Sequence, residues 1–167
     1  KANGSEAAGN HYRAIAENFT EYWLHHANAG DHYKLQYNLK GDTFSLKYNL
    51  LWDKVLDLNL FNETVYALES QIYLKKANPY GVPLDNRANF TKADWLIWVA
   101  AITPSQKDFE NLVGMLYKFA DETPDRVPLS DWYETDTAKV KGFRARPVVG
   151  GIYAKMLLTS QSSRFTF

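Results

Sequence analysis

Cysteine is absent from the 167 residues of this chain. Its absence excludes disulfide bonds, thiolate metal ligands and a cysteine nucleophile from these residues. The compartment in which the protein works cannot be read from cysteine usage and stays open at this point.

An excess of charge of either sign is also missing. Lys and Arg together number 19, and so do Asp and Glu. No net electrostatic field therefore favours nucleic acid or an anionic membrane. The chain also has no glycine-rich phosphate loop, basic cluster or aromatic RNA-binding motif. We expect neither nucleic acid nor a membrane as a partner.

Long apolar runs and metal-ligand patterns are missing as well. The apolar stretch Leu96 to Ile102 is far too short to span a bilayer, and Lys1 to Ser5 has no features of a signal peptide. The i, i+4 spacing of a helical metal site does not occur among the four histidines, His11, His25, His26 and His32. We expect a soluble chain that binds no metal and no cofactor.

The chain is rich in aromatic residues and has a length suited to one domain. A chain of 167 residues can bury about two-thirds of its unfolded surface. Aromatic residues make up 15% of it, including 5 Trp and 11 Tyr, which exceeds the need of a small helical core. We therefore expect some of these side chains to line a cavity.

Apolar residues at three- and four-residue spacing predict six helices, bounded by polar N-caps and by Gly or Pro stops. Their predicted ranges are 10–28, 44–58, 62–77, 95–102, 105–120 and 148–159. The predicted caps are Asn10, Asn62, Thr91 and Ser105, and Asp94 completes a capping box with Thr91.

Three of these helices are apolar on nearly every side, which is typical of helices buried all round: 44–58, 95–102 and 148–158. They alternate with three amphipathic helices. The alternation predicts an all-α fold of antiparallel helical hairpins that forms part of an (α/α) toroid. The predicted divisions are a disordered or fragmentary N-terminus at 1–9, a helical-hairpin domain at 10–159 and a C-terminal tail at 160–167.

Two stretches without a regular period share a sequence signature. Val-Pro-Leu followed by Asp-Trp occurs after Tyr80 and again after Arg126, and the two prolines are about 45 residues apart, the length of one two-helix repeat. The second stretch continues to Gly151, and ordered loops of that length are often functional. We expect both loops to meet at one inner rim and to form a pocket there.

Five motifs follow one another along the chain: Tyr48-Asn-Leu-Leu-Trp-Asp53, Tyr80-Gly-Val-Pro-Leu-Asp-Asn-Arg87, Thr91-Lys-Ala-Asp-Trp95, Arg126-Val-Pro-Leu-Ser-Asp-Trp-Tyr133 and Gly142-Phe-Arg-Ala-Arg-Pro-Val-Val-Gly-Gly151. Together they resemble the C-terminal region of the glutaminase A type proteins of fungi and Bacteroides-like bacteria, over about residues 10–158. The resemblance implies an all-helical, six-hairpin-toroid-like region at the end of a larger secreted or periplasmic protein. The implied activity is hydrolysis of the glutamine side-chain amide to glutamate and ammonia. It implies no residue roles.

Amide hydrolysis needs an attacking group, donors for the oxyanion and a grip on the charged ends of the amino acid. Neither Ser-x-x-Lys nor Gly-x-Ser-x-Gly occurs in the chain, so these motifs give a serine mechanism no support. Water activated by a carboxylate remains, and the candidate bases are Asp85, Asp94 and Asp131. The candidate substrate-binding residues are Asp53, Arg87, Trp95, Trp132, Tyr133, Arg144 and Arg146.

Each candidate also has a structural interpretation. Asp94 suits a helix cap, and Asp131 suits an ion pair with Arg126 that orders the loop, as Asp85 does with Arg87. The tryptophans suit core packing as well as a substrate platform. Asp53 lies in an apolar segment and needs a partner, for which Lys54 or a loop arginine is available.

Two function classes follow from these residues. The first is an amidohydrolase that acts on an amino acid. The second is a carbohydrate-binding or glycoside hydrolase-like domain, in which paired carboxylates act beside aromatic platforms. The expected partners are a small-molecule substrate, either amino acid or sugar, and the remainder of a full-length protein. A third interpretation is that these residues only support a site elsewhere in that protein.

Overall fold

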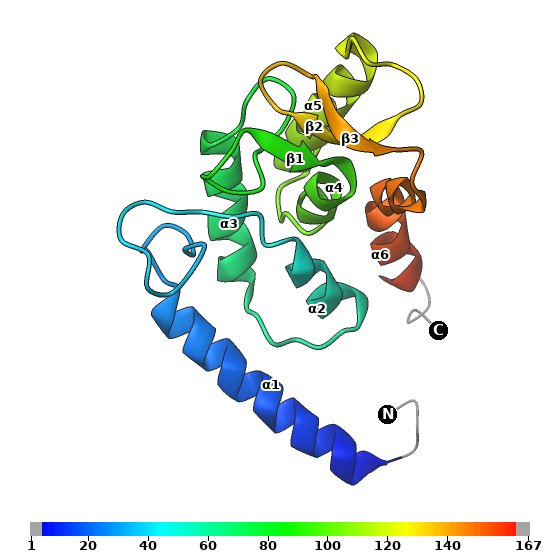
Figure 1. Cartoon of the computed structure of the whole chain (residues 1–167). Helices are drawn as coiled ribbons and strands as arrows, with labels where there is room; N and C mark the ends of the chain where they lie inside the picture. The colour runs from blue at the N-terminus through cyan, green and yellow to red at the C-terminus, as the bar shows by residue number, and fades with distance from the viewer. Residues whose placement is uncertain (1–4, 163–167) are drawn as a thin grey trace.

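The computed structural model describes residues 5–162, with side chains for residues 5–160 (Figure 1). Its elements in chain order are α1 (Glu6–His26), η1 (Tyr48–Leu50), α2 (Leu51–Val55), α3 (Glu63–Lys75), β1 (Phe90–Lys92), α4 (Ala93–Ala101), α5 (Gln106–Glu122), β2 (Ser130–Glu134), β3 (Val140–Arg144), η2 (Pro147–Tyr153) and α6 (Ala154–Ser162). The described chain is therefore a mixed α/β fold, and the predicted all-α fold is wrong.

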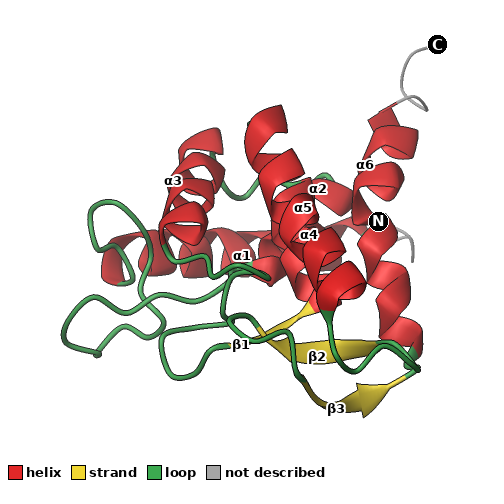
Figure 2. Ribbon diagram, turned by 90° about the horizontal axis from the view of Figure 1, so that it is seen from above, coloured by secondary structure: helices red, strands yellow, loops and turns green. Residues whose placement is uncertain are grey.

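The three strands form one antiparallel sheet in the order β1-β2-β3. Phe90 of β1 pairs with Glu134 of β2, and Ser130 of β2 pairs with Arg144 of β3. Figure 2 shows this sheet on one side of the helical layer. The pairing of β1 with β2 brings the two signature stretches together as strands of a sheet, whereas the expectation was two irregular loops at the rim of a helical array.

The strands were not predicted from the sequence, because they are short and bury polar residues. β2 buries Ser130 and Asp131 together with Tyr133. A half-buried strand is usually predicted from the alternation of apolar and polar residues along the sequence. Buried polar side chains remove that alternation. Long-range pairing, and not a local pattern, forms this sheet.

Two helices begin at their predicted caps. Asn62 starts α3, because its Oδ1 accepts a hydrogen bond from the backbone N–H of Val65 at 3.3 Å. Ser105 starts α5, because its Oγ accepts from the N–H of Asp108 at 3.2 Å. These two predictions are confirmed.

The starts of two other helices differ from prediction. α1 begins at Glu6 with Ser5 as its cap, so it starts before Asn10 and extends into the segment 1–9. Residues 1–4 and 163–167 lie outside the described range, and the predicted division of the chain stays a prediction. Thr91 lies in β1 and Lys92 precedes α4 without a side-chain cap, so the predicted capping box with Asp94 is wrong.

The predicted helix 44–58 is also wrong at both of its ends. Leu46 is not helical and donates its N–H to the Leu84 carbonyl at 2.8 Å, and only η1 and α2 are helical in this segment. Trp52 and Leu56 are 42% and 59% exposed, so the segment is not buried all round. An unbroken apolar run does not by itself distinguish a helix from a buried extended segment.

The last predicted helix consists of η2 followed by α6. Ala154 is buried against α2 and α4, whereas Tyr153 and Met156 are 61% and 67% exposed. Of the three helices predicted to form an inner layer, α4 is the one that is buried on most sides, with Leu96, Ile97, Val99 and Ala100 all inaccessible. It contacts η1, α2, α5, η2 and α6.

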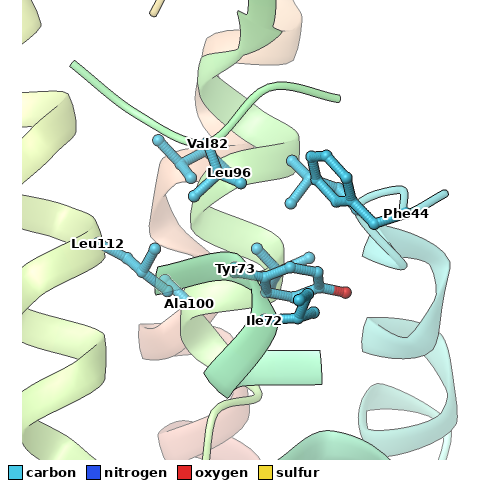
Figure 3. Close-up of a cluster of buried hydrophobic side chains, with 9 residues drawn as sticks. Phe44, Ile72, Tyr73, Val82, Leu96, Ala100 and Leu112 are labelled. Atoms are coloured by element: carbon cyan, nitrogen blue, oxygen red, sulfur yellow. The ribbon is translucent and has the colours of Figure 1, made fainter. Parts of the chain in front are cut away.

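The largest part of the core surrounds α4 (Figure 3). Its buried side chains come from α3, α4, α5 and the extended segments before η1 and β1: Phe44, Leu46, Ile72, Tyr73, Val82, Leu96, Val99, Ala100 and Leu112. Since β1 runs directly into α4, this core fixes the position of the first residues of α4 relative to the sheet.

We expect Leu96→Ala to lower the free energy of unfolding by about 3 kcal/mol, because Leu96 is fully buried and its loss leaves a cavity. Chemical unfolding followed by tryptophan fluorescence measures the change. Leu56→Ala is the matched control, with an expected change below about 0.5 kcal/mol at a largely exposed position. Equal effects of the two changes would contradict the central position of α4.

Candidate functional site

Trp95, in the first turn of α4, separates two cavities. The first, here the Asp85 cavity, has a volume of about 490 Å³ and is lined by Ser45, Lys47, Tyr48, Asp85, Arg87 and Trp95 among others. The second, the Asp94 cavity, has about 340 Å³ and is lined by Lys92, Asp94, Trp95, Trp98, Arg146 and Gly151 among others. Both have the size of a small-molecule site.

The wall between the cavities is an aromatic stack. The rings of Tyr48 and Trp95 lie parallel with centroids 4.0 Å apart. Burial, followed by the negative charge of Asp94, raises the pKa of the Tyr48 hydroxyl. The stack therefore joins η1 to α4, and the electrostatics of one cavity reach the other.

Asp85 and Arg87 form a local ion pair in the Asp85 cavity. The guanidinium Nε and Nη2 of Arg87 donate to the two carboxylate oxygens of Asp85 at 2.9 and 2.6 Å, and the Arg87 backbone N–H donates at 2.9 Å. Burial alone would raise the pKa of Asp85, but the hydrogen bonds from Arg87 outweigh it and lower that pKa. The predicted pairing of Asp85 with Arg87 is confirmed, and Asp85 is ionised at neutral pH.

Asp94 has the opposite electrostatic character. Its side chain is buried, and within the described residues its Oδ1 has no hydrogen-bond partner. Burial raises the pKa of Asp94, and the charge of Asp131 adds to that rise. A carboxyl group held in this way exchanges its proton closer to neutral pH than an ordinary aspartate does.

Gly151 allows η2 to approach Asp94. A Cβ at this position would lie 2.7 Å from Trp98 Nε1 and 2.8 Å from Asp94 Cβ. Neither distance is tolerable for a carbon atom, so any side chain here would push η2 away from α4. This glycine therefore closes the Asp94 cavity.

Asp131 is fully buried and binds two cations. Arg146 donates through Nε to Oδ1 at 3.1 Å and through Nη2 to Oδ2, and Lys92 Nζ lies 3.3 Å from Oδ2. Burial would raise the pKa of Asp131, but Arg146 and then Lys92 lower it overall. Asp131 therefore stays ionised and holds Lys92 and Arg146 at the edge of the Asp94 cavity.

The sequence candidates thus divide into two groups that meet at Trp95. Asp94, Asp131 and Arg146 lie together on one side, whereas Asp85 and Arg87 lie on the other. The predicted pairing of Asp131 with Arg126 is wrong, because Arg126 donates to the Asp121 carbonyl.

The remaining candidates lie outside the linings of both cavities. Tyr133 is buried against Phe119 with ring centroids 3.5 Å apart, and Arg144 is exposed on β3. Trp132 is half-buried, with Lys92 Nζ 4.8 Å from its ring centroid.

Asp53 is buried away from both cavities and has a different partner from the one predicted. Its Oδ2 accepts from the Tyr66 hydroxyl at 2.6 Å, and its Oδ1 accepts from the Leu60 N–H at 2.9 Å. The expected pairing with Lys54 or a loop arginine is wrong. Asp53 instead orders the connection between α2 and α3, where a carboxylate can satisfy free backbone N–H groups.

Several polar and aromatic lining residues were not among the candidates predicted from the sequence: Ser45, Lys47, Tyr48, Lys92 and Trp98. Lys92 was visible inside the motif Thr91-Lys-Ala-Asp94, where a lysine beside apolar residues needs a buried anion. Its partner Asp131 lies far away in sequence, so the pair could not be recognised locally.

No helix in the described range is long and apolar enough to cross a membrane, and no three His, Cys, Asp or Glu side chains there form a metal site.

Comparison with known proteins gives one family. A family model described as the glutaminase A six helical-hairpin domain matches residues 1–156. Glutaminase A of Aspergillus oryzae is 37% identical over 109 residues, which cover 64% of this chain and 16% of that protein. A probable glutaminase of Arthroderma benhamiae is 36% identical over 98 residues, which cover 56% and 11%. The chain thus spans less than a fifth of either relative's length, and no solved structure gives a significant match.

We expect Asp94→Asn to be more favourable for stability, relative to the wild type, at pH 7 than at pH 4. The folded-state pKa of Asp94 is raised, so the wild type loses stability as pH rises through that pKa and the buried carboxylate becomes charged. The amide of Asn does not ionise. Unfolding free energies of both proteins at pH 4 and pH 7 measure this difference, and a variant that loses stability more steeply with pH than the wild type would contradict it.

Asp131→Asn should act in the opposite direction. Its folded-state pKa is lowered, so it contributes stability above its ordinary pKa, and this contribution is lost as pH falls. Removing the charge leaves Lys92 and Arg146 without their anion, and we expect a loss of about 3 kcal/mol at pH 7. The exposed Asp121→Asn is the control. Urea unfolding tests both, and a stable Asp131→Asn variant would refute the structural role.

Proposed function

Because the family model covers almost the whole chain, the chain belongs to the glutaminase A six helical-hairpin family, and we propose that it is part of a longer glutaminase whose substrate binds beside Trp95. The reaction is hydrolysis of the side-chain amide of glutamine to glutamate and ammonia. The matching relatives are a glutaminase A and a probable glutaminase, and they lend no support to the alternative of a carbohydrate-binding or glycoside hydrolase-like domain.

The observation that supports this site most directly is the Asp85 and Arg87 pair. A free amino acid carries an ammonium and a carboxylate on one carbon atom, and Asp85 and Arg87 offer the two complementary charges at neighbouring positions. The Arg87 side chain is 71% exposed, so it reaches a ligand without leaving the cavity edge. The Asp85 carboxylate stays ionised because its pKa is lowered.

The rest of the cavity suits the uncharged part of such a ligand. Trp95 and Tyr48 present a stacked aromatic wall, and Trp23 and Phe61 contribute further apolar lining. Apolar walls with a few placed polar groups are typical of small-molecule sites, since the polar groups fix the orientation of the ligand. In this arrangement the amino-acid end binds at Asp85 and Arg87 and the side-chain amide points into the cavity.

We expect Arg87→Gln in the full-length protein to raise the KM for glutamine about tenfold and to leave kcat nearly unchanged. The lost interaction is the proposed charged hydrogen bond from Arg87 to the substrate, which this placement makes in both the ground state and the transition state. Ammonia release at varied glutamine concentration measures both constants.

The exposed Arg126→Gln is the matched control and should behave as the wild type does. A wild-type protein that releases no ammonia from glutamine would refute the function. An unchanged KM in Arg87→Gln, with an active wild type, would refute only the placement of the amino-acid end.

A further inference from the structure

The Asp85 cavity contains a serine and a lysine in direct contact. Lys47 Nζ lies 2.9 Å from Ser45 Oγ, within hydrogen-bond distance. Both side chains line the cavity. They lie two residues apart in the segment before η1, where Ser45 is in an isolated β-bridge and Lys47 is the residue that precedes η1.

Ser45 is also next to the amino-acid end of the proposed substrate. It forms an isolated antiparallel bridge with Asp85, which brings the two backbones into contact. The Ser45 hydroxyl therefore lies in the same cavity as the Asp85 and Arg87 pair, and not behind the Trp95 wall with Asp94.

Lys47 has the surroundings of a proton acceptor. Its side chain is 12% exposed, and Nζ also donates to the carbonyls of Tyr33 and Ser45 at 2.9 and 3.0 Å. A neutral amine can keep both of these donor bonds and accept the third from the Ser45 hydroxyl. Burial lowers the pKa of Lys47, and this effect exceeds the opposing attraction of Glu69, whose Oε2 is 3.9 Å away.

Glu69 is the acidic neighbour of Lys47 in this cluster, with its Oε2 3.9 Å from Lys47 Nζ. It is buried, its Oε1 accepts from the Tyr33 N–H at 2.8 Å, and its Oε2 has no hydrogen-bond partner in the described residues. Burial raises the pKa of Glu69, which weakens its hold on the lysine charge. Burial therefore disfavours the charged forms of both Lys47 and Glu69.

We propose that Ser45 is the nucleophile of glutamine hydrolysis and that Lys47 is its proton acceptor. This inference rests on the proposed function and names the attacking group at the same site. The chain contains no Ser-x-x-Lys motif, which places serine and lysine on one face of a helix. Ser45-Leu46-Lys47 makes the same contact outside a helix, at a spacing of two residues.

The chemical steps balance with water as the second reactant. Ser45 Oγ bonds to the amide carbon while its proton moves to the neutral Lys47 amine. Lys47 then gives that proton to the departing nitrogen, the C–N bond breaks, and ammonia leaves a γ-glutamyl ester on Ser45. Water attacks the ester, Lys47 takes its proton and returns it to Ser45 Oγ, and glutamate is released.

The test uses the full-length protein and four single variants. Ser45→Ala removes the nucleophile, and Lys47→Arg keeps a positive charge and donors but cannot become a neutral base. Ser70→Ala is the matched control, because Ser70 is buried outside the cavity with its hydroxyl bonded to the Tyr66 carbonyl. Asp94→Asn tests the competing route, in which a carboxylate activates water. Circular dichroism confirms that each variant is folded.

Ammonia release and capture by hydroxylamine are measured for each protein. We expect Ser45→Ala and Lys47→Arg to lose at least about a thousandfold in kcat, and Ser70→Ala to stay within about twofold of the wild type. The wild type should form γ-glutamyl hydroxamate when hydroxylamine is added, because the amine attacks the ester in place of water.

Two results would overturn the inference, and they distinguish a wrong nucleophile from a wrong function. Full activity of Ser45→Ala, with an inactive Asp94→Asn, would show that water attacks directly and would leave the proposed function standing. A wild-type protein that releases no ammonia from glutamine would refute the proposed function itself and with it the substrate of Ser45.

Discussion

The buried Asp131 carboxylate is the interaction on which the rest of the site depends. It joins Lys92 at the end of β1, its own strand β2, and Arg146 just before η2. A carboxylate without solvent contact is costly unless it is paired, and these two cations compensate it. The three segments are thereby held at the start of α4, where Trp95 separates the two cavities.

The carboxylates around Trp95 differ because their neighbours differ. Asp85 and Asp131 each face a guanidinium and remain ionised, whereas Asp94 is buried with an unpaired oxygen and has a raised pKa. Three aspartates between positions 85 and 131 thus have two roles available: binding of cations and exchange of protons. The uncompensated Asp94 is a cost to folding, and such costs are common at functional sites.

The parts of the fold that were predictable are local ones. Asn62 and Ser105 start α3 and α5 by hydrogen bonds to N–H groups three residues away, and Asp85 pairs with Arg87 two residues away. The sheet was missed because β1 and β2 pair across about 40 residues and bury polar side chains. The helix predicted at 44–58 was too long, because the apolar residues at its ends are equally compatible with a buried segment that is not helical.

Residue order and short spacings are enough to indicate the family, the helix caps Asn62 and Ser105, and the list of chemically capable residues. Which of those residues meet depends on the fold of the whole chain. This fold brings Asp131 to Lys92 and Arg146, and it places the segment of Ser45 and Lys47 against Asp85. Such contacts depend on the packing of distant segments around α4. The free energy that stabilises them comes from the folded chain as a whole, so a local stretch of sequence does not predict them.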